Sequence, residues 1–168
     1  HLDALVLMAM LPLRLLPRVR PVASAEYFLR GRWRSWFATR VIGIIPVATC
    51  GGGSRAEVLE PVRDALAVGD MVIFFPEGTR GEPECLGKLK TGIVWLVEQL
   101  PETPVHPVRL SGLGKVLPKG HWLPVPFLCD AWVGETLRWQ GDPSGFMAAL
   151  AASLTPPEPQ VAAVREGR

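Results

Sequence analysis

Short apolar segments of strand length alternate with longer segments of helical periodicity along this chain, and this alternation constrains the fold more than any other feature. Short apolar runs bounded by turn signals are typical of buried strands, whereas longer amphipathic stretches are typical of helices. We expect strands at residues 21–23, 44–47, 71–75, 105–110 and 131–133, and helices at residues 3–11, 25–39, 55–68, 91–99 and 143–154. The alternation predicts a single-domain α/β layered fold with a mostly parallel central sheet flanked by helices.

The length of 168 residues suits one domain that buries a core without disulfide or metal support. We assign residues 1–154 to that domain and residues 155–168 to a proline-rich tail or linker. Cys50, Cys85 and Cys129 are widely spaced and odd in number, so we expect reduced thiols and no metal site. The formal net charge of +2 is too small to indicate a nucleic-acid partner.

The strongest candidate for a functional site is Phe75-Pro76-Glu77-Gly78-Thr79-Arg80, which follows the apolar run at residues 71–73. Pro76 cannot donate to a sheet ladder, so the strand should end there, and Gly78 permits a sharp turn. A carboxylate, a hydroxyl and a guanidinium are thereby gathered at a strand end, where open α/β sheets bind ligands. Arg80 can grip a phosphate through two parallel hydrogen bonds. The competing interpretation is a surface turn with an ion pair.

These six residues resemble the signature block of the 1-acylglycerol-3-phosphate acyltransferases, the lysophospholipid acyltransferase superfamily of glycerolipid acyltransferases. Three further segments resemble blocks of that family. They are Lys88-Leu89-Lys90-Thr91-Gly92, Thr103-Pro104-Val105-His106-Pro107-Val108 and Val133-Gly134-Glu135-Thr136-Leu137. The resemblance implies that the signature block binds the phosphate end of an acyl acceptor. The acceptor-binding residues that it implies are Thr49, Phe75, Pro76, Glu77, Gly78, Thr79, Arg80 and Lys90.

The family's catalytic box is His-x-x-x-x-Asp, and this chain opens with His1-Leu2-Asp3. The resemblance makes Asp3 the carboxylate that orients the catalytic histidine, which is then expected ahead of residue 1. We therefore expect a fragment cut inside the active-site box. Two alternatives are that His1 is itself the base and that the chain is a degenerate, inactive homologue. Asp3 can also serve as the N-cap of the first helix.

A second family block is an apolar stretch that ends in an arginine bound to the acceptor phosphate. Residues 41–47 fit the apolar part, but Ala48-Thr49 stands where that arginine is expected. Arg55 could supply the missing charge, and the alternative is that it is an exposed loop arginine. The glycine run at residues 51–53 lacks the Lys-Ser/Thr ending of a P-loop, so we interpret it as a flexible turn before the next helix.

Residues 14–40 carry seven arginines, one acid and five aromatic residues, Trp33 and Trp36 among them. Such a segment suits the lipid headgroup boundary, where cations meet phosphates and aromatic rings lie just below them. The alternatives are a solvated basic face and RNA binding. The longest apolar run, residues 4–13, is too short to span a bilayer. We expect a peripheral protein on the cytoplasmic face of a membrane.

These observations predict an acyltransferase that moves a fatty acyl group from acyl-CoA or acyl carrier protein to the free hydroxyl of a lysophospholipid. The favoured acceptor is 1-acylglycerol-3-phosphate, and the reaction belongs to phospholipid biosynthesis. No cofactor or metal is expected beyond the acyl donor. The alternative function is a catalytically inactive homologue of the same fold that binds a lipid surface.

Overall fold

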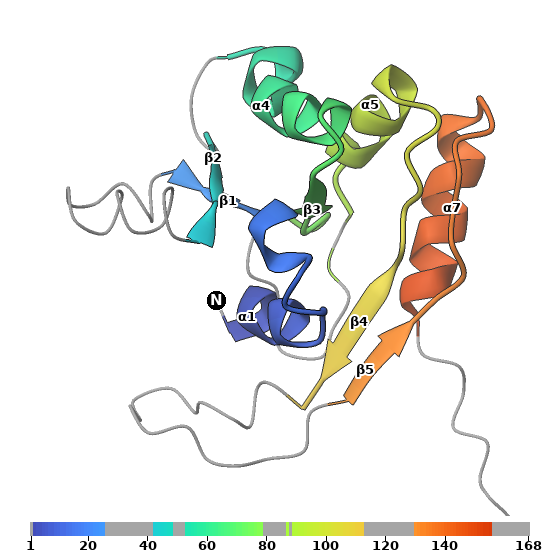
Figure 1. Ribbon diagram of the computed structural model, residues 1–168. Helices are drawn as coiled ribbons and strands as arrows, with labels where there is room; N and C mark the ends of the chain where they lie inside the picture. Colours follow the sequence, from blue (N-terminus) through green and yellow to red (C-terminus); the bar gives the residue numbers. More distant parts are fainter. Residues whose placement is uncertain are drawn as a thin grey trace, which may run out of the picture.

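The computed structural model describes residues 2–25, 42–48, 53–78, 87, 89–112 and 130–155 (Figure 1). Its helices are α1 (Leu2–Ala9), the 3-10 helix η1 (Leu16–Arg18), α4 (Arg55–Ala67), α5 (Gly92–Gln99) and α7 (Pro143–Leu154). Its strands are β1 (Val19–Ser24), β2 (Ile45–Val47), β3 (Met71–Ile73), β4 (Val108–Ser111) and β5 (Asp130–Val133). The helix expected at residues 25–39 falls outside the described residues, apart from Ala25. Each other expected element is present.

The parallel sheet has three strands in the order β2–β1–β3, and β1 runs parallel to both neighbours. β3 pairs with the first half of β1, with Val19 opposite Met71, whereas β2 pairs with the second half, with Val22 opposite Ile45. The expected α/β fold is therefore confirmed. β4 and β5 differ from the expectation of one central sheet, because they form a separate antiparallel pair.

Three strands are shorter than the sequence predicts, and of these β3 and β4 differ most from the expected residues. β3 ends at Ile73, because Phe74 leaves the ladder and packs into the core. β4 begins at Val108, because Pro107 has no N–H to donate to a ladder. Val105 instead forms an isolated antiparallel bridge with Leu137. The signature block after β3 and residues 103–107 before β4 therefore have irregular backbone rather than strand structure, apart from the bridge at Val105.

Helix α4 has well-defined ends that position β3 after it. Ser54 and Glu57 form a reciprocal capping box at its amino end. At its carboxyl end Gly69 adopts a φ of 84°, and the Gly69 and Asp70 N–H groups donate to carbonyl oxygens of the last turn, which is a Schellman motif. Asp70 then accepts a 2.9 Å hydrogen bond from Arg20 Nε of β1. These contacts fix where β3 starts beside β1.

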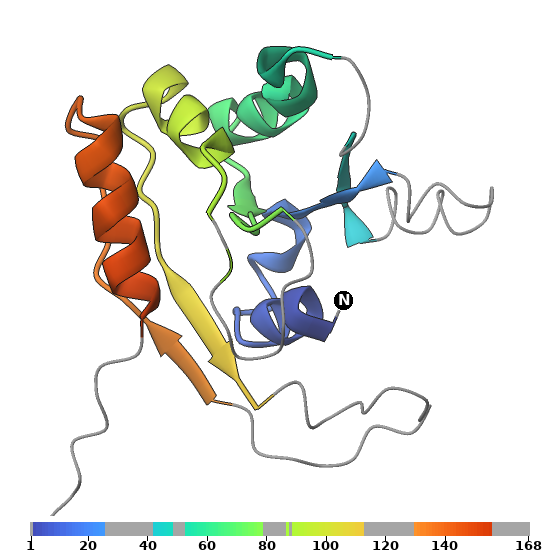
Figure 2. The same cartoon turned by 180° about the vertical axis from the view of Figure 1, so that it is seen from behind.

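The core consists of two apolar clusters. One lies where α5 packs on α7, and the other lies among β1, β2, α4 and α5; Figures 1 and 2 show these helices side by side. The first cluster contains Ile93, Val94, Val97, Phe146, Leu150 and Leu154, and the second contains Val22, Ile45, Leu59, Val62 and Leu96. Phe74 packs against both clusters, so the residue after β3 joins the two halves of the core.

Candidate active site

The turn after β3 holds the first part of the candidate site. The Gly78 N–H donates to the Phe75 carbonyl oxygen at 3.1 Å, which closes a turn over residues 75–78 with Pro76 at its second position. Gly78 has a φ of 63°, a conformation that residues with a side chain rarely adopt. Phe74 points into the core, whereas Phe75 is 40% exposed. The turn is thus anchored on one side and open on the other.

Lys90 lies directly across this turn. Its backbone N–H donates to the Pro76 carbonyl oxygen at 2.8 Å. A Cβ placed on Gly78 would lie 2.8 Å from Lys90 Cδ and 2.9 Å from Lys90 Nζ. Gly78 is therefore needed both for the backbone conformation and for the room that the lysine side chain occupies. Two segments that the sequence places in separate blocks form one unit.

The Lys90 ammonium is exposed and available to an anion. Within the part of the chain that the structure describes, the Lys90 side chain makes no hydrogen bond or ion pair. Glu77 does not neutralise it, because its carboxylate reaches toward Gly87, where an added Cβ would lie 2.9 Å from Glu77 Oε2. A lone ammonium beside a glycine turn can take up a phosphate as a point charge with three donors.

A cavity of about 70 Å³ lies beside the turn. Phe74 and Pro76 line one wall, and residues 105–108 of the Val-His-Pro-Val block line another. Ile93 of α5 and Leu150 and Leu154 of α7 complete the lining. The structure therefore brings the signature block and the late proline-containing block, about 30 residues apart in the sequence, to one apolar cavity.

The sequence, with His106 between two prolines of an expected strand, predicts a packed core histidine rather than a catalytic one. The structure instead shows His106 exposed and lining this cavity. Its Nδ1 lies 3.0 Å from the Thr136 hydroxyl oxygen, which comes from the segment that follows β5. This contact ties the late block to residues 133–137, another of the segments that resemble blocks of the family.

This chain matches a known protein family over most of its length. The family described as Acyltransferase matches residues 1–111 of this chain, which is well over half of its length. The chain belongs to the acyltransferase family. The matched region includes the turn at residues 75–78, Lys90 and the late block. Leu150 and Leu154, which close the cavity, lie beyond it.

Two plant proteins are similar to half of this acyltransferase-family chain. It is 32% identical over 84 residues to the chloroplastic 1-acyl-sn-glycerol-3-phosphate acyltransferase BAT2 of Brassica napus. It is 33% identical over 84 residues to the chloroplastic 1-acyl-sn-glycerol-3-phosphate acyltransferase LPAT1 of Arabidopsis thaliana. Each alignment covers 50% of this chain but only 24% and 23% of the respective relative. No solved structure matches the chain.

Asp3, the orienting carboxylate that the family pattern implies, lies in the first turn of α1 and is half-buried. Because α1 begins at Leu2, Asp3 is inside the helix, and the expectation that it caps the helix is wrong. Its charge still suits a first turn, where the helix dipole favours an anion.

Several predicted site residues fall outside the described residues. They are His1, Thr49, Thr79 and Arg80, so their roles stay predictions. The same holds for the three cysteines. Arg55 is described, and it is an exposed residue at the start of α4 rather than part of a loop. No group of three or more His, Cys, Asp or Glu side chains that could hold a metal is found in the described part of the chain.

Sequence reasoning missed the contribution of α7 to the cavity. Phe146, Leu150 and Leu154 recur at helical spacing, which signals a buried face. That spacing does not say which surface the face covers, so Leu150 and Leu154 could not be assigned to the site. Thr136 was likewise missed as the partner of His106, because the pairing depends on the turn of chain after β5.

Proposed function

We propose that this chain forms the acceptor-binding part of an enzyme that transfers a fatty acyl group to the free hydroxyl of a lysophospholipid, with 1-acylglycerol-3-phosphate as the acceptor. The observation that carries the proposal is the Lys90 ammonium, which lies across the glycine turn without an ion pair among the described residues. The name shared by the two plant relatives supports this choice of acceptor.

In this proposal the acceptor phosphate binds at the turn, between Lys90 and the guanidinium of Arg80. Arg80 can make two parallel hydrogen bonds to phosphate oxygens, whereas Lys90 supplies a compact charge. The apolar cavity beside Phe74 and Pro76 takes an apolar part of a substrate. Glu77 is turned toward Gly87, so in this proposal it does not bind the anion directly.

The chemical step needs a base that removes the hydroxyl proton as the acceptor oxygen attacks the thioester carbonyl. The family pattern assigns that role to a histidine five residues before Asp3, with Asp3 fixing its tautomer and stabilising the imidazolium. The carbon–oxygen bond forms, the carbon–sulfur bond breaks, and the proton passes to the departing thiolate. Acyl-CoA and acyl carrier protein are both suitable donors in this scheme.

We further propose that the protein works at a membrane surface, as a peripheral protein on the cytoplasmic face. The arginine-rich and aromatic composition of residues 14–40 supports this, although residues 26–41 lie outside the described part of the structure. Among the described helices, none is long and apolar enough to cross a membrane.

The test is an acyl-transfer assay on the full-length gene product that contains this chain. Purified protein is given 1-acylglycerol-3-phosphate and either acyl-CoA or acyl carrier protein, and mass spectrometry follows the diacyl product. The proposal predicts product with at least one donor, and loss of product when the upstream histidine is replaced. Acceptor binding without any product from either donor would favour the inactive lipid-binding homologue instead.

A further inference from the structure

Large apolar side chains are exposed at the amino-terminal end of the parallel sheet. Met10 and Leu13, in the connection between α1 and η1, are 53% and 82% exposed. Val68 and Met71, on either side of the turn from α4 into β3, are 71% and 40% exposed. Leu13 has the largest exposed fraction of the large hydrophobic residues that the structure describes. Folding leaves these four residues facing solvent.

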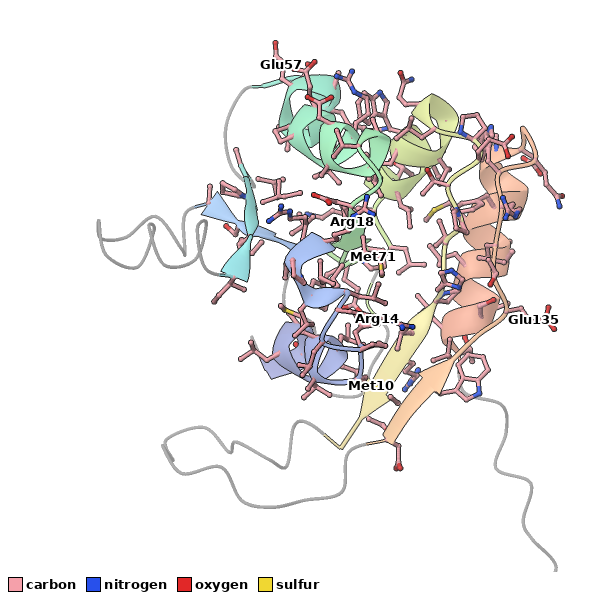
Figure 3. The ribbon with its side chains drawn as sticks, viewed as in Figure 1. Met10, Arg14, Arg18, Glu57, Met71 and Glu135 are labelled. Carbon is pink, nitrogen blue, oxygen red and sulfur yellow. The ribbon has the colours of Figure 1, made fainter. Side chains whose placement is uncertain are left out.

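The two groups of residues adjoin one another. Arg18 Nη2 donates to the Val68 carbonyl oxygen at 3.2 Å, and Val19 pairs with Met71 across the β1–β3 ladder. Leu13 and Arg18 lie in consecutive tight turns, since the Leu16 N–H donates to the Leu13 carbonyl oxygen and the Arg18 N–H to the Leu15 carbonyl oxygen. In Figure 3 Arg18, Met71, Arg14 and Met10 are seen one below another in the middle of the view. We call this the amino-edge surface; it comprises Met10, Leu13, Arg14, Arg18, Val68 and Met71.

The charge of the amino-edge surface is positive. Residues 4–25 contain three arginines and no acid. Arg14 is exposed and makes no ion pair within the described residues. Asp70 forms ion pairs with two arginines, and the shorter one is to Arg20 Nε at 2.9 Å. Arg18 Nε lies 3.7 Å from the other Asp70 oxygen, and the Arg18 side chain is 59% exposed. Two guanidinium groups therefore accompany the apolar residues at the surface.

Exposed apolar side chains beside Arg14, which has no ion pair among the described residues, and the largely exposed Arg18 match the chemistry of an anionic bilayer. The apolar groups enter the region just below the headgroups, and the guanidinium groups pair with lipid phosphates. We infer that the amino-edge surface docks this protein on an anionic phospholipid bilayer, an inference that deepens the membrane part of the proposed function. β3 has three residues, so about 10 Å of strand separates the docked surface from the turn at residues 75–78. Docking keeps the acceptor site close to the lipid from which its substrate comes.

The test is co-sedimentation of the 168-residue chain with vesicles of phosphatidylcholine alone or mixed with phosphatidylglycerol. The double variant Met10→Gln/Leu13→Gln removes apolar surface without adding charge, and Val133→Gln is its matched control, because Val133 is 55% exposed on β5. We expect the double variant to bind the mixed vesicles at least tenfold more weakly. The Val133 variant should bind as the parent chain does.

The charge part of the inference is tested with Arg14→Gln, for which Arg55→Gln is the matched control. Both arginines are exposed, but Arg55 lies at the start of α4. Arg14→Gln should weaken binding to the mixed vesicles about fivefold at low salt, and the difference should disappear at high salt. Arg55→Gln should have no such effect.

Equal losses in the Met10/Leu13 and Val133 variants, or no loss in either, would overturn the inference. A concentration-dependent dimer in sedimentation velocity that the Met10/Leu13 variant abolishes would also overturn it, since the surface would then bind a second copy. The vesicle assay needs no catalysis. A chain that fails to bind vesicles would therefore not contradict the acyl-transfer proposal, which the product assay tests separately. Vesicle binding without product formation would contradict the acyl-transfer proposal and not the docking inference.

Discussion

At the scale of single residues, Gly78 occupies a position that only glycine fits well. Its φ of 63° excludes most side chains on backbone grounds, and the Lys90 side chain fills the space where a Cβ would stand. Gly141 offers a comparison, because its φ is 85° and nothing lies within 4 Å of an added Cβ. Both glycines have a positive φ, but only Gly78 has a neighbouring side chain, that of Lys90, in the space that a Cβ would need.

We therefore expect Gly78→Ala and Gly141→Ala to destabilise the fold by a similar amount, about 1 kcal/mol, from strained backbone. Only Gly78→Ala should also weaken acceptor binding, because its methyl group displaces Lys90. Urea unfolding measures the first effect, and calorimetric titration with 1-acylglycerol-3-phosphate measures the second. Equal acceptor affinity in the two variants would show that the position of Lys90 over the turn is unimportant.

At the scale of elements, the helix ends are where local sequence most directly determined structure. Ser54 and Glu57 are spaced as a capping box and form one, and Gly69 ends α4 as its sequence position predicts. Asp142 begins α7 by accepting from the Ser144 and Gly145 N–H groups, both at 2.9 Å. These boundaries were predictable because each depends on residues close together in the chain.

Asp142→Ala should lower the free energy of unfolding by about 1 kcal/mol, because it leaves two N–H groups of α7 without their acceptor. Asp142→Asn keeps a side-chain oxygen at the same place and should cost only a few tenths of that amount. Thermal unfolding followed by circular dichroism separates the two variants. Identical midpoints for both would mean that the cap contributes nothing to stability.

For the whole molecule, the sequence predicted the class of fold but not how its strands divide between sheets. Which strand pairs with which depends on contacts between distant residues, so the separation of the β4–β5 pair was not foreseen. The last residue of β3 and the first residue of β4 differ from the expected ones for the same reason, because Phe74 and Val105 contact residues that are distant in the sequence. The same holds for the candidate site. The turn at residues 75–78 depends on neighbouring residues and was predicted, whereas the cavity wall formed by α7 depends on distant contacts and was not.

Phe74 provides a test of the core as a unit, because it packs against both apolar clusters. Phe74→Ala should destabilise the protein by about 3 kcal/mol through the cavity that it leaves. The neighbouring Phe75 is 40% exposed, so Phe75→Ala should cost less than about 1 kcal/mol. Denaturant unfolding of both variants measures the difference. Similar losses would contradict the inward and outward placement of the two rings.

The central claim is that the turn at residues 75–78 presents Lys90, together with Arg80, to the phosphate of the acceptor. Its most direct test compares kcat/KM for 1-acylglycerol-3-phosphate with kcat/KM for monoacylglycerol, which lacks the phosphate, in the full-length gene product that contains this chain. Lys90→Ala and Arg80→Ala should each lower kcat/KM for the phosphate-bearing acceptor at least tenfold, on the order of 1.4 kcal/mol for one lost charge-assisted contact, and leave monoacylglycerol turnover unchanged. Equal losses for both acceptors, or no loss for the phosphate-bearing one, would contradict the claim.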